Sequence, residues 1–201
     1  MNRADFSNTS HAHRGSLQGE ARRREVKPRW QLCRERGASA DDILQMFMIR
    51  TPPVPVLKIL RGLDIDVRAL DHDPGWDGAV DGSAEPATIW YSRAVAPVRQ
   101  RFTLAHELGH LLLHPLTRTF RDRTNEASVK AHVQERQADS FAAELLMPSW
   151  LLTRFVEVAN AETKRLAALF QVSRAAMARR LITIYGPHAT REHSATSPHT
   201  R

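Results

Sequence analysis

Two histidines spaced four residues apart carry the clearest chemical signal in the sequence. They lie in His106-Glu107-Leu108-Gly109-His110, inside the run APVRQRFTLAHELGHLLLH at 96–114. Four residues turn an α-helix by about 400°, so both imidazoles project from one face and can bind the same zinc ion. Glu107 lies one residue further round, where its carboxylate can accept a proton from a water molecule that the metal activates. The segment therefore predicts a hydrolytic zinc site.

A catalytic zinc site needs a third protein ligand and one open coordination position. A histidine six residues beyond His110 would complete one known pattern, but that position is Leu116. His114 lies one turn beyond His110, yet three ligands stacked on one straight helix would not converge on a tetrahedral ion. We therefore interpret His114 as a residue at the helix C-terminus, where the helix dipole favours it, with a place in the substrate cleft as the alternative.

The next helical segment offers a better third ligand in Glu135-Arg136-Gln137-Ala138-Asp139. Taken alone, Glu135 would be interpreted as a solvated helix charge. An antiparallel helix pair would bring it to the zinc face, and Asp139 could then accept the second ring N–H of a ligand histidine. Two other carboxylates are weaker candidates, because Glu126 lies at the helix start and Glu144 points about 180° away from Glu135 on an ideal helix.

Two segments, RQRFTLAHELGHLLLH at 99–114 and ERQADSFAAELLMP at 135–148, resemble the ImmA/IrrE-type zinc metallopeptidases. The resemblance extends from Pro52 to about Gly186. It implies a zincin-like fold of the gluzincin kind, with His106, His110 and Glu135 binding one Zn²⁺, Glu107 as general base and Asp139 supporting a ligand. It also implies a protein substrate, a helix-turn-helix transcriptional repressor encoded nearby.

Hydrophobic periodicity and turn residues favour an α+β fold that is mainly helical, with a small antiparallel sheet. The expected strands are 64–70, 78–80 and 88–91. The expected helices are 40–50, one before Gly62, one from Pro97 that Pro115 ends, 126–146, and 149–160. Gly109 costs helix propensity, which suggests that another backbone or the substrate approaches closely there.

Residues 162–186 resemble a helix-turn-helix, with a tight turn at 171–173. Apolar packing positions fall at Ala167, Val172, Met177 and Leu181. Gln171 replaces the usual turn glycine, which favours packing or partner binding over sequence-specific DNA binding. The candidate contacts to nucleic acid or a partner are Arg174, Arg179 and Arg180.

The expected organisation has four parts. A basic extension at 1–38 is expected to be mostly disordered, with helix only within 20–36, because it lacks an apolar period. The metallopeptidase domain occupies 39–148 and the helix-turn-helix-like unit 149–186, and a disordered tail follows at 187–201.

Composition excludes several classes of protein. The chain has 201 residues and 42% of them are hydrophobic, which is too many for a wholly disordered protein. No apolar run is long enough to cross a membrane, and the first thirty residues contain no apolar signal segment. The single cysteine, Cys33, excludes an internal disulfide framework, so a cytoplasmic location is expected. The net charge of +7 is concentrated at the two ends, which favours an acidic partner or nucleic acid, or simply solvated tails.

Two functions follow as hypotheses. The first is a cytoplasmic zinc endopeptidase that cleaves a regulatory protein, and the second is a DNA- or repressor-binding regulator that acts without proteolysis. Glu107 favours the enzyme, since a purely structural zinc site has no use for a general base. Tyr91 and His132 are candidates for stabilising an oxyanion.

Overall fold

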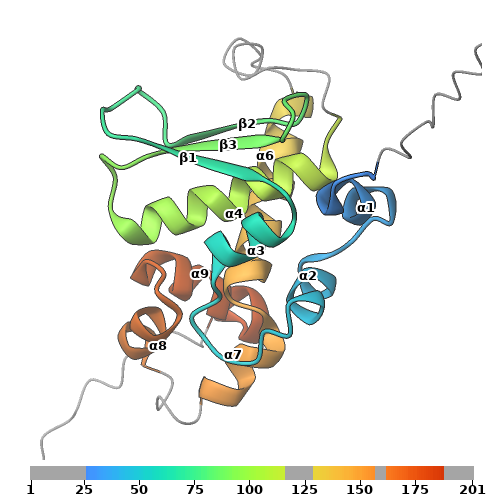
Figure 1. Cartoon of the computed structure of the whole chain (residues 1–201). Coiled ribbons are helices and arrows are strands. Elements are labelled where there is room, and N and C mark those ends of the chain that lie inside the picture. The colour runs from blue at the N-terminus through green and yellow to red at the C-terminus, as the bar shows by residue number, and fades with distance from the viewer. Residues whose placement is uncertain (1–25, 116–128, 157–161, 188–201) are drawn as a thin grey trace, which may run out of the picture.

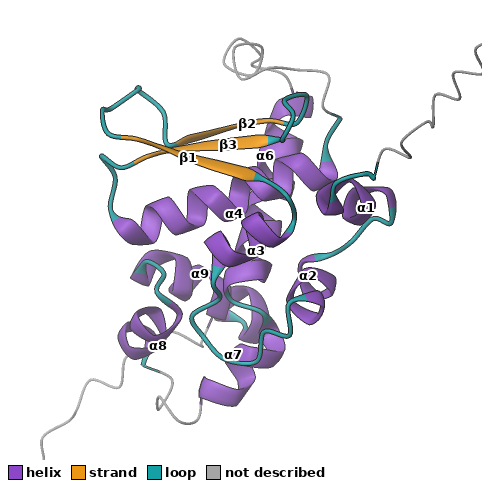
Figure 2. Ribbon diagram, viewed as in Figure 1, coloured by secondary structure: helices purple, strands orange, loops and turns teal. Residues whose placement is uncertain are grey.

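Helix α4 (Pro97–Leu113) lies beneath a three-stranded sheet and forms the centre of the fold (Figure 1). The structure is a computed structural model that describes residues 26–115, 129–156 and 162–187. Within these residues the fold is α+β and mostly helical, as predicted, with the strands gathered at one side of the helices (Figure 2). Pro97 occupies the first turn of α4 and Pro115 follows its end, as the sequence indicates.

The sheet contains β1 (Asp66–Leu70), β2 (Gly78–Asp81) and β3 (Thr88–Ser92), in the order β1-β3-β2. The prediction of a wholly antiparallel sheet is wrong. Strand directions alternate along the chain, but β3 lies between the other two strands. Consequently β3 pairs antiparallel with β2 and parallel with β1, so the sheet is mixed.

Two glycines allow close packing on either side of α4. A Cβ atom added at Gly109 would lie 3.2 Å from the Cα atom of Ala138, so α6 (Val129–Leu146) crosses α4 at this point. A Cβ atom added at Gly78 would clash with Thr103 Cγ2 and lie 3.3 Å from Glu107 Cγ. The expectation that a backbone approaches Gly109 closely is confirmed, and Gly78 brings β2 close to side chains of the same helix.

Three shorter helices complete the part of the core around α4 and α6. They are α2 (Ala40–Met46), α3 (Val56–Gly62) and α7 (Ser149–Val156). Ser39 begins α2 with a capping box, in which its hydroxyl accepts from the backbone N–H of Asp42. The predicted start of the helix at 126, with Glu126, and the predicted end at 160 lie outside the described residues.

Helix α1 (Arg29–Glu35) corrects the predicted extension at 1–38. Trp30 and Cys33 are each 2% exposed and belong to the same hydrophobic core as α4. A seven-residue helix with few apolar positions is too short to show a helical pattern of apolar residues in the sequence. The folded region therefore begins before residue 39, and residues 1–25 lie outside the described residues.

Removing residues 1–38 is expected to destabilise the protein, because the deletion empties the site that Trp30 fills. Trp30→Ala alone should lower the free energy of unfolding by about 3–5 kcal/mol, the usual cost of truncating a buried aromatic side chain. Urea unfolding of the full chain and the variant measures this loss. Leu32→Ala, at a partly exposed position of the same helix, is the control and should cost much less. An unchanged unfolding midpoint in the truncated chain would contradict the assignment of α1 to the core.

The helix-turn-helix-like unit consists of α8 (Thr163–Phe170) and α9 (Arg174–Tyr185). Gln171 adopts a left-handed backbone with φ 53°, the conformation that the usual glycine would supply. All four predicted apolar positions of this unit are buried: Ala167, Val172, Met177 and Leu181. They join one hydrophobic core with side chains of α4 and α6, on both sides of the predicted boundary at 148–149.

Arg101 of α4 ties this unit to the rest of the protein. Its guanidinium donates to the backbone oxygens of Gln171 at 3.2 Å and of Val54 at 2.9 Å. Burial lowers the pKa of this arginine. The contacts give α8 and α9 a packing role, in line with the preference stated from the sequence.

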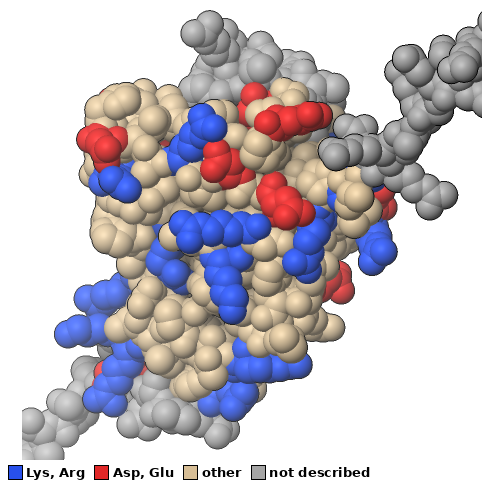
Figure 3. Space-filling view, in the orientation of Figure 1, with Lys and Arg blue, Asp and Glu red and all other residues tan. Residues whose placement is uncertain are grey.

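Charge is unevenly distributed over the face shown in Figure 3. Lys and Arg gather across its middle and lower part, below the sheet, whereas Asp and Glu lie mainly around the sheet. Among the helices that the structure describes, none combines the length and apolar character of a membrane span.

Candidate metal centre

Three side chains from α4 and α6 converge where the two helices cross. The Nε2 atoms of His106 and His110 lie 2.9 Å apart. Glu135 faces both rings, with Oε2 3.2 Å from Nε2 of His106 and Oε1 3.3 Å from Nε2 of His110. The predicted pair of helices therefore brings together the three residues that the sequence nominated, and Glu144 of α6 is not part of the group.

The donor atoms of this group suit a metal ion. One ligand atom from each of the three residues lies within 4.8 Å of the others. Asp139 Oδ1 lies 2.9 Å from His106 Nδ1 and accepts its hydrogen, which leaves a lone pair on Nε2. This lone pair faces a second imidazole and a carboxylate, so either a proton or a metal ion is needed to hold the atoms together. Two imidazoles and one carboxylate are a ligand set that divalent transition metals accept.

The electrostatics of the metal-free group also favour a cation at this position. In the metal-free protein, hydrogen bonds from the protonated rings of His106 and His110 hold the pKa of Glu135 well below its usual range, although burial opposes this. Burial alone would lower the pKa of His106, but Glu135, Glu107 and Asp139 together raise it. A proton therefore competes with a metal for this ring, and the competition begins at a higher pH than for an ordinary histidine.

Glu107 lies beside this group, in a cleft of about 420 Å³ between α4 and the chain leading into β2. Its side chain is 6% exposed. The cleft is lined by Gly75, Trp76, Asp77, Gly78, Arg99, Phe102, Thr103, His106, Glu107 and Asp139. A peptide that enters the cleft thus meets a carboxylate and a candidate metal ligand at the same place.

Family comparison agrees with this geometry. The profile of the IrrE N-terminal-like domain, Peptidase_M78, matches residues 60–182, which include α4 and α6. The chain belongs to this family. The resemblance to ImmA/IrrE-type metallopeptidases is thereby confirmed.

Two further similarities place the IrrE-like chain among known proteins. It is 39% identical over 56 residues to Uncharacterized immunity region protein 2 of Bacillus phage phi105, an alignment that covers 27% of this chain and 34% of the phage protein. A solved structure, a Mycobacterium tuberculosis transcriptional regulator, has a TM-score of 0.55 at 15% identity and supports the fold. That match covers 80% of this chain and 52% of the regulator, so this chain spans about half of the regulator and a third of the phage protein.

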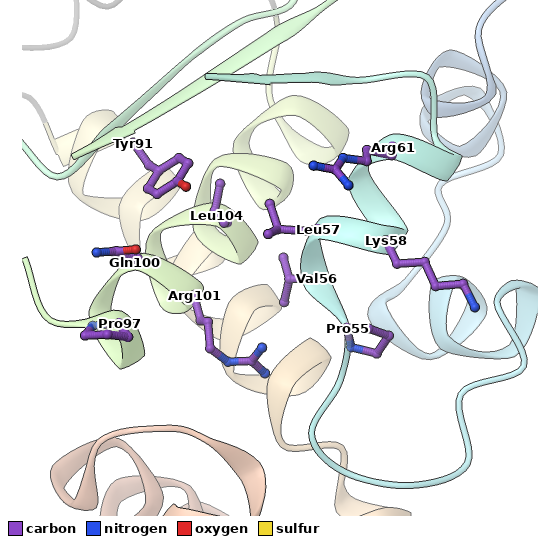
Figure 4. Close-up of a pocket in the computed structure, with 10 residues that line it drawn as sticks. All are labelled: Pro55, Val56, Leu57, Lys58, Arg61, Tyr91, Pro97, Gln100, Arg101 and Leu104. Atoms are coloured by element: carbon purple, nitrogen blue, oxygen red, sulfur yellow. The ribbon is translucent and has the colours of Figure 1, made fainter. Parts of the chain in front are cut away.

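A larger hollow of about 590 Å³ lies on the opposite side of α4 (Figure 4). Its ten lining residues are Pro55, Val56, Leu57, Lys58, Arg61, Tyr91, Pro97, Gln100, Arg101 and Leu104. They include no histidine or carboxylate, so the hollow lacks the ligands that hold a metal, and chemistry rather than size identifies the smaller cleft as the site. Tyr91 belongs to this hollow and His132 is exposed on α6, so neither candidate for stabilising an oxyanion lines the metal cleft.

The sequence did not indicate two contacts of the His114 ring. His114 caps the end of α4, as interpreted, but its side chain is only 7% exposed and its Nδ1 atom lies 2.9 Å from His110 Nδ1. The other nitrogen of His114, Nε2, lies 3.1 Å from Oε1 of Gln137. The i, i+4 spacing of His110 and His114 is the sequence feature that indicates their contact.

The three arginines proposed for nucleic acid or partner contacts differ in accessibility. Arg174 and Arg179 are exposed on α9. Arg180 is half-buried and its Nε atom donates to the backbone oxygen of Met147 at 3.0 Å, which ties α9 to the end of α6. Arg180 is therefore committed to an internal contact.

Proposed function

We propose that this chain is a zinc-dependent endopeptidase that hydrolyses a peptide bond in a helix-turn-helix transcriptional repressor. The observation that carries the proposal is the convergence of His106, His110 and Glu135, together with the cleft that His106 lines beside the buried Glu107. Membership of the IrrE N-terminal-like family supports the enzymatic reading. The phage relative is named for an immunity region, which supports a regulatory substrate.

His106, His110 and Glu135 would hold the ion and leave a fourth position open, the arrangement of catalytic zinc sites. When bound, zinc acts as a Lewis acid that polarises the scissile carbonyl and lowers the pKa of water. Asp139 orients His106 by accepting its Nδ1 hydrogen. The Glu107 carboxylate accepts a proton from the attacking water and passes it to the leaving amide nitrogen.

The cleft beside Glu107 offers a place for the substrate. Its lining includes Gly75, Trp76 and Asp77, which lead into β2, and Gly78, the first residue of that strand. A peptide that enters the cleft would meet the Glu107 carboxylate and the His106 ring.

The direct test uses the purified full chain and the repressor encoded beside its gene. We expect about one zinc per chain, cleavage of the repressor, loss of cleavage with a chelator and recovery with added zinc. The same pair is also tested in cells, with the repressor's own promoter driving a reporter, so that an activator missing from the purified system is present. Derepression with the repressor left intact would contradict the peptidase proposal.

The second candidate is a regulator that binds DNA or a repressor without proteolysis. It is favoured by the exposure of Arg174 and Arg179 on α9 and by the basic character of the face in Figure 3. Cations at the start of a second helix in such a unit can contact phosphates. Loss of the Glu107 carboxylate separates the two candidates, because only the enzyme needs it.

A further inference from the structure

A chain of side-chain contacts ends on the ring of His110. Gln137 Oε1 lies 3.1 Å from His114 Nε2, and His114 Nδ1 lies 2.9 Å from His110 Nδ1. Gln137 is exposed on α6, whereas His114 and His110 are 7% and 5% exposed. The contacts therefore run from the surface of α6 to the buried side of the candidate metal group.

The positions of the hydrogens follow from the chemistry of these groups. An amide oxygen can only accept, so the contact with Gln137 Oε1 places the hydrogen of His114 on Nε2. A neutral imidazole has one N–H, so His114 Nδ1 is an acceptor and His110 Nδ1 must donate to it. The hydrogen of His110 thus lies on Nδ1, and its Nε2 atom keeps the lone pair that faces His106 and Glu135.

We propose that Gln137 and His114 are positioning residues that hold His110 in the tautomer whose Nε2 atom binds the metal ion. The proposal rests on the metal site of the proposed function and names what supports its second histidine. With the amide of Gln137 reversed, its N–H group would donate to His114, and His114 would donate to His110. The hydrogen of His110 would then sit on Nε2 and block the metal.

The two histidines of the site have partners of different kinds. The side chain of Asp139, the partner of His106, is 58% exposed, whereas His114, the partner of His110, is 7% exposed. A surface amide that orients the His114 ring thereby also orients the His110 ring on the buried side of the site.

The first test replaces Gln137 by methionine, which removes the acceptor while keeping a long side chain. Zinc affinity, measured by competition with a chromophoric chelator, should fall by about 10-fold, the lower end of losses seen when an orienting partner is removed. The control is Gln134→Met, the same change on the same helix at a side chain with no hydrogen bond among the described residues. Because Gln137 is exposed, Gln137→Met should leave thermal unfolding unchanged.

A second variant separates positioning from packing. In His114→Asn the amide oxygen can accept directly from His110 Nδ1–H, so Gln137 is no longer needed to set the tautomer. Adding Gln137→Met should then change zinc affinity little. A packing role for Gln137 would give the same loss in both backgrounds.

The hydrogen bond itself is measured by ¹⁵N NMR of the histidine rings, in the wild type and in Gln137→Met. We expect an N–H signal from His110 Nδ1 with a coupling across the hydrogen bond to the unprotonated Nδ1 of His114, and its loss in Gln137→Met. This measurement decides the proposal even if His114→Asn does not fold. Protonation of His110 at Nε2 in the wild type, or unchanged zinc affinity in Gln137→Met, would overturn it. Failure of the wild type to bind zinc would overturn the proposed function, whereas a missing bond between His110 and His114 overturns only this inference.

Discussion

Replacing Glu107 by glutamine is expected to lower cleavage of the cognate repressor by about 10²–10⁴-fold, the usual weight of general acid–base catalysis. Glutamine keeps the size of the side chain but cannot accept a proton at neutral pH. Glu107 is not among the three converging side chains of the candidate metal group, so zinc content should stay near one per chain. Cleavage rate, zinc content and repressor pull-down are measured on the same preparation, and binding of the repressor should persist.

The matched control is Glu144→Gln, the same change at an exposed position of α6 that is not part of the metal group. It should leave cleavage unchanged. In cells, the reporter driven by the repressor's promoter should stay repressed with Glu107→Gln and be relieved with Glu144→Gln. Relief that persists undiminished in Glu107→Gln would mean that the protein sequesters the repressor or binds DNA. Arg174 and Arg179 would then become the residues to mutate.

The candidate metal group could be predicted from the sequence because each of its two helices contributes residues that lie close together in the chain. A spacing of four residues on a helix fixes that His106 and His110 share a face, and the same spacing links Glu135 to Asp139. The one requirement that is not local is the contact between the two helices, and Gly109 marks the point where α6 crosses α4. Local rules plus one contact between helices are therefore enough to build the group.

Features that depend on distant parts of the chain were less accessible. The strand positions follow from periodicity, but the placement of β3 between β1 and β2 depends on tertiary packing, which alternation of polar and apolar residues does not encode. Trp30 looked like part of a polar extension because a short helix offers few apolar positions. Gln137 became important only through its contact with His114, a residue 23 positions earlier in the sequence.

Replacing Glu135 by alanine is expected to weaken zinc binding more than any other single change on α6. The two oxygens of Glu135 face both imidazoles at 3.2 and 3.3 Å, so the variant loses a candidate ligand and the only carboxylate of the converging group. The loss should exceed the roughly 10–100-fold expected for Asp139→Ala, which removes only the partner of the His106 ring. Glu135 is half exposed, so the fold should survive the change. Competition with a chelator measures both affinities.

The order of these losses is the informative result. Glu144→Ala removes a carboxylate from the same helix and should leave zinc affinity unchanged, because that residue stands outside the group. If Asp139→Ala weakened zinc binding more than Glu135→Ala, the assignment of Glu135 as the carboxylate ligand would be wrong. Full zinc occupancy and activity in Glu135→Ala would remove Glu135 from the site altogether. His114 would then be the next residue to test, since its ring already contacts His110, and a direct role for it in metal binding would also contradict its role as the partner that orients His110.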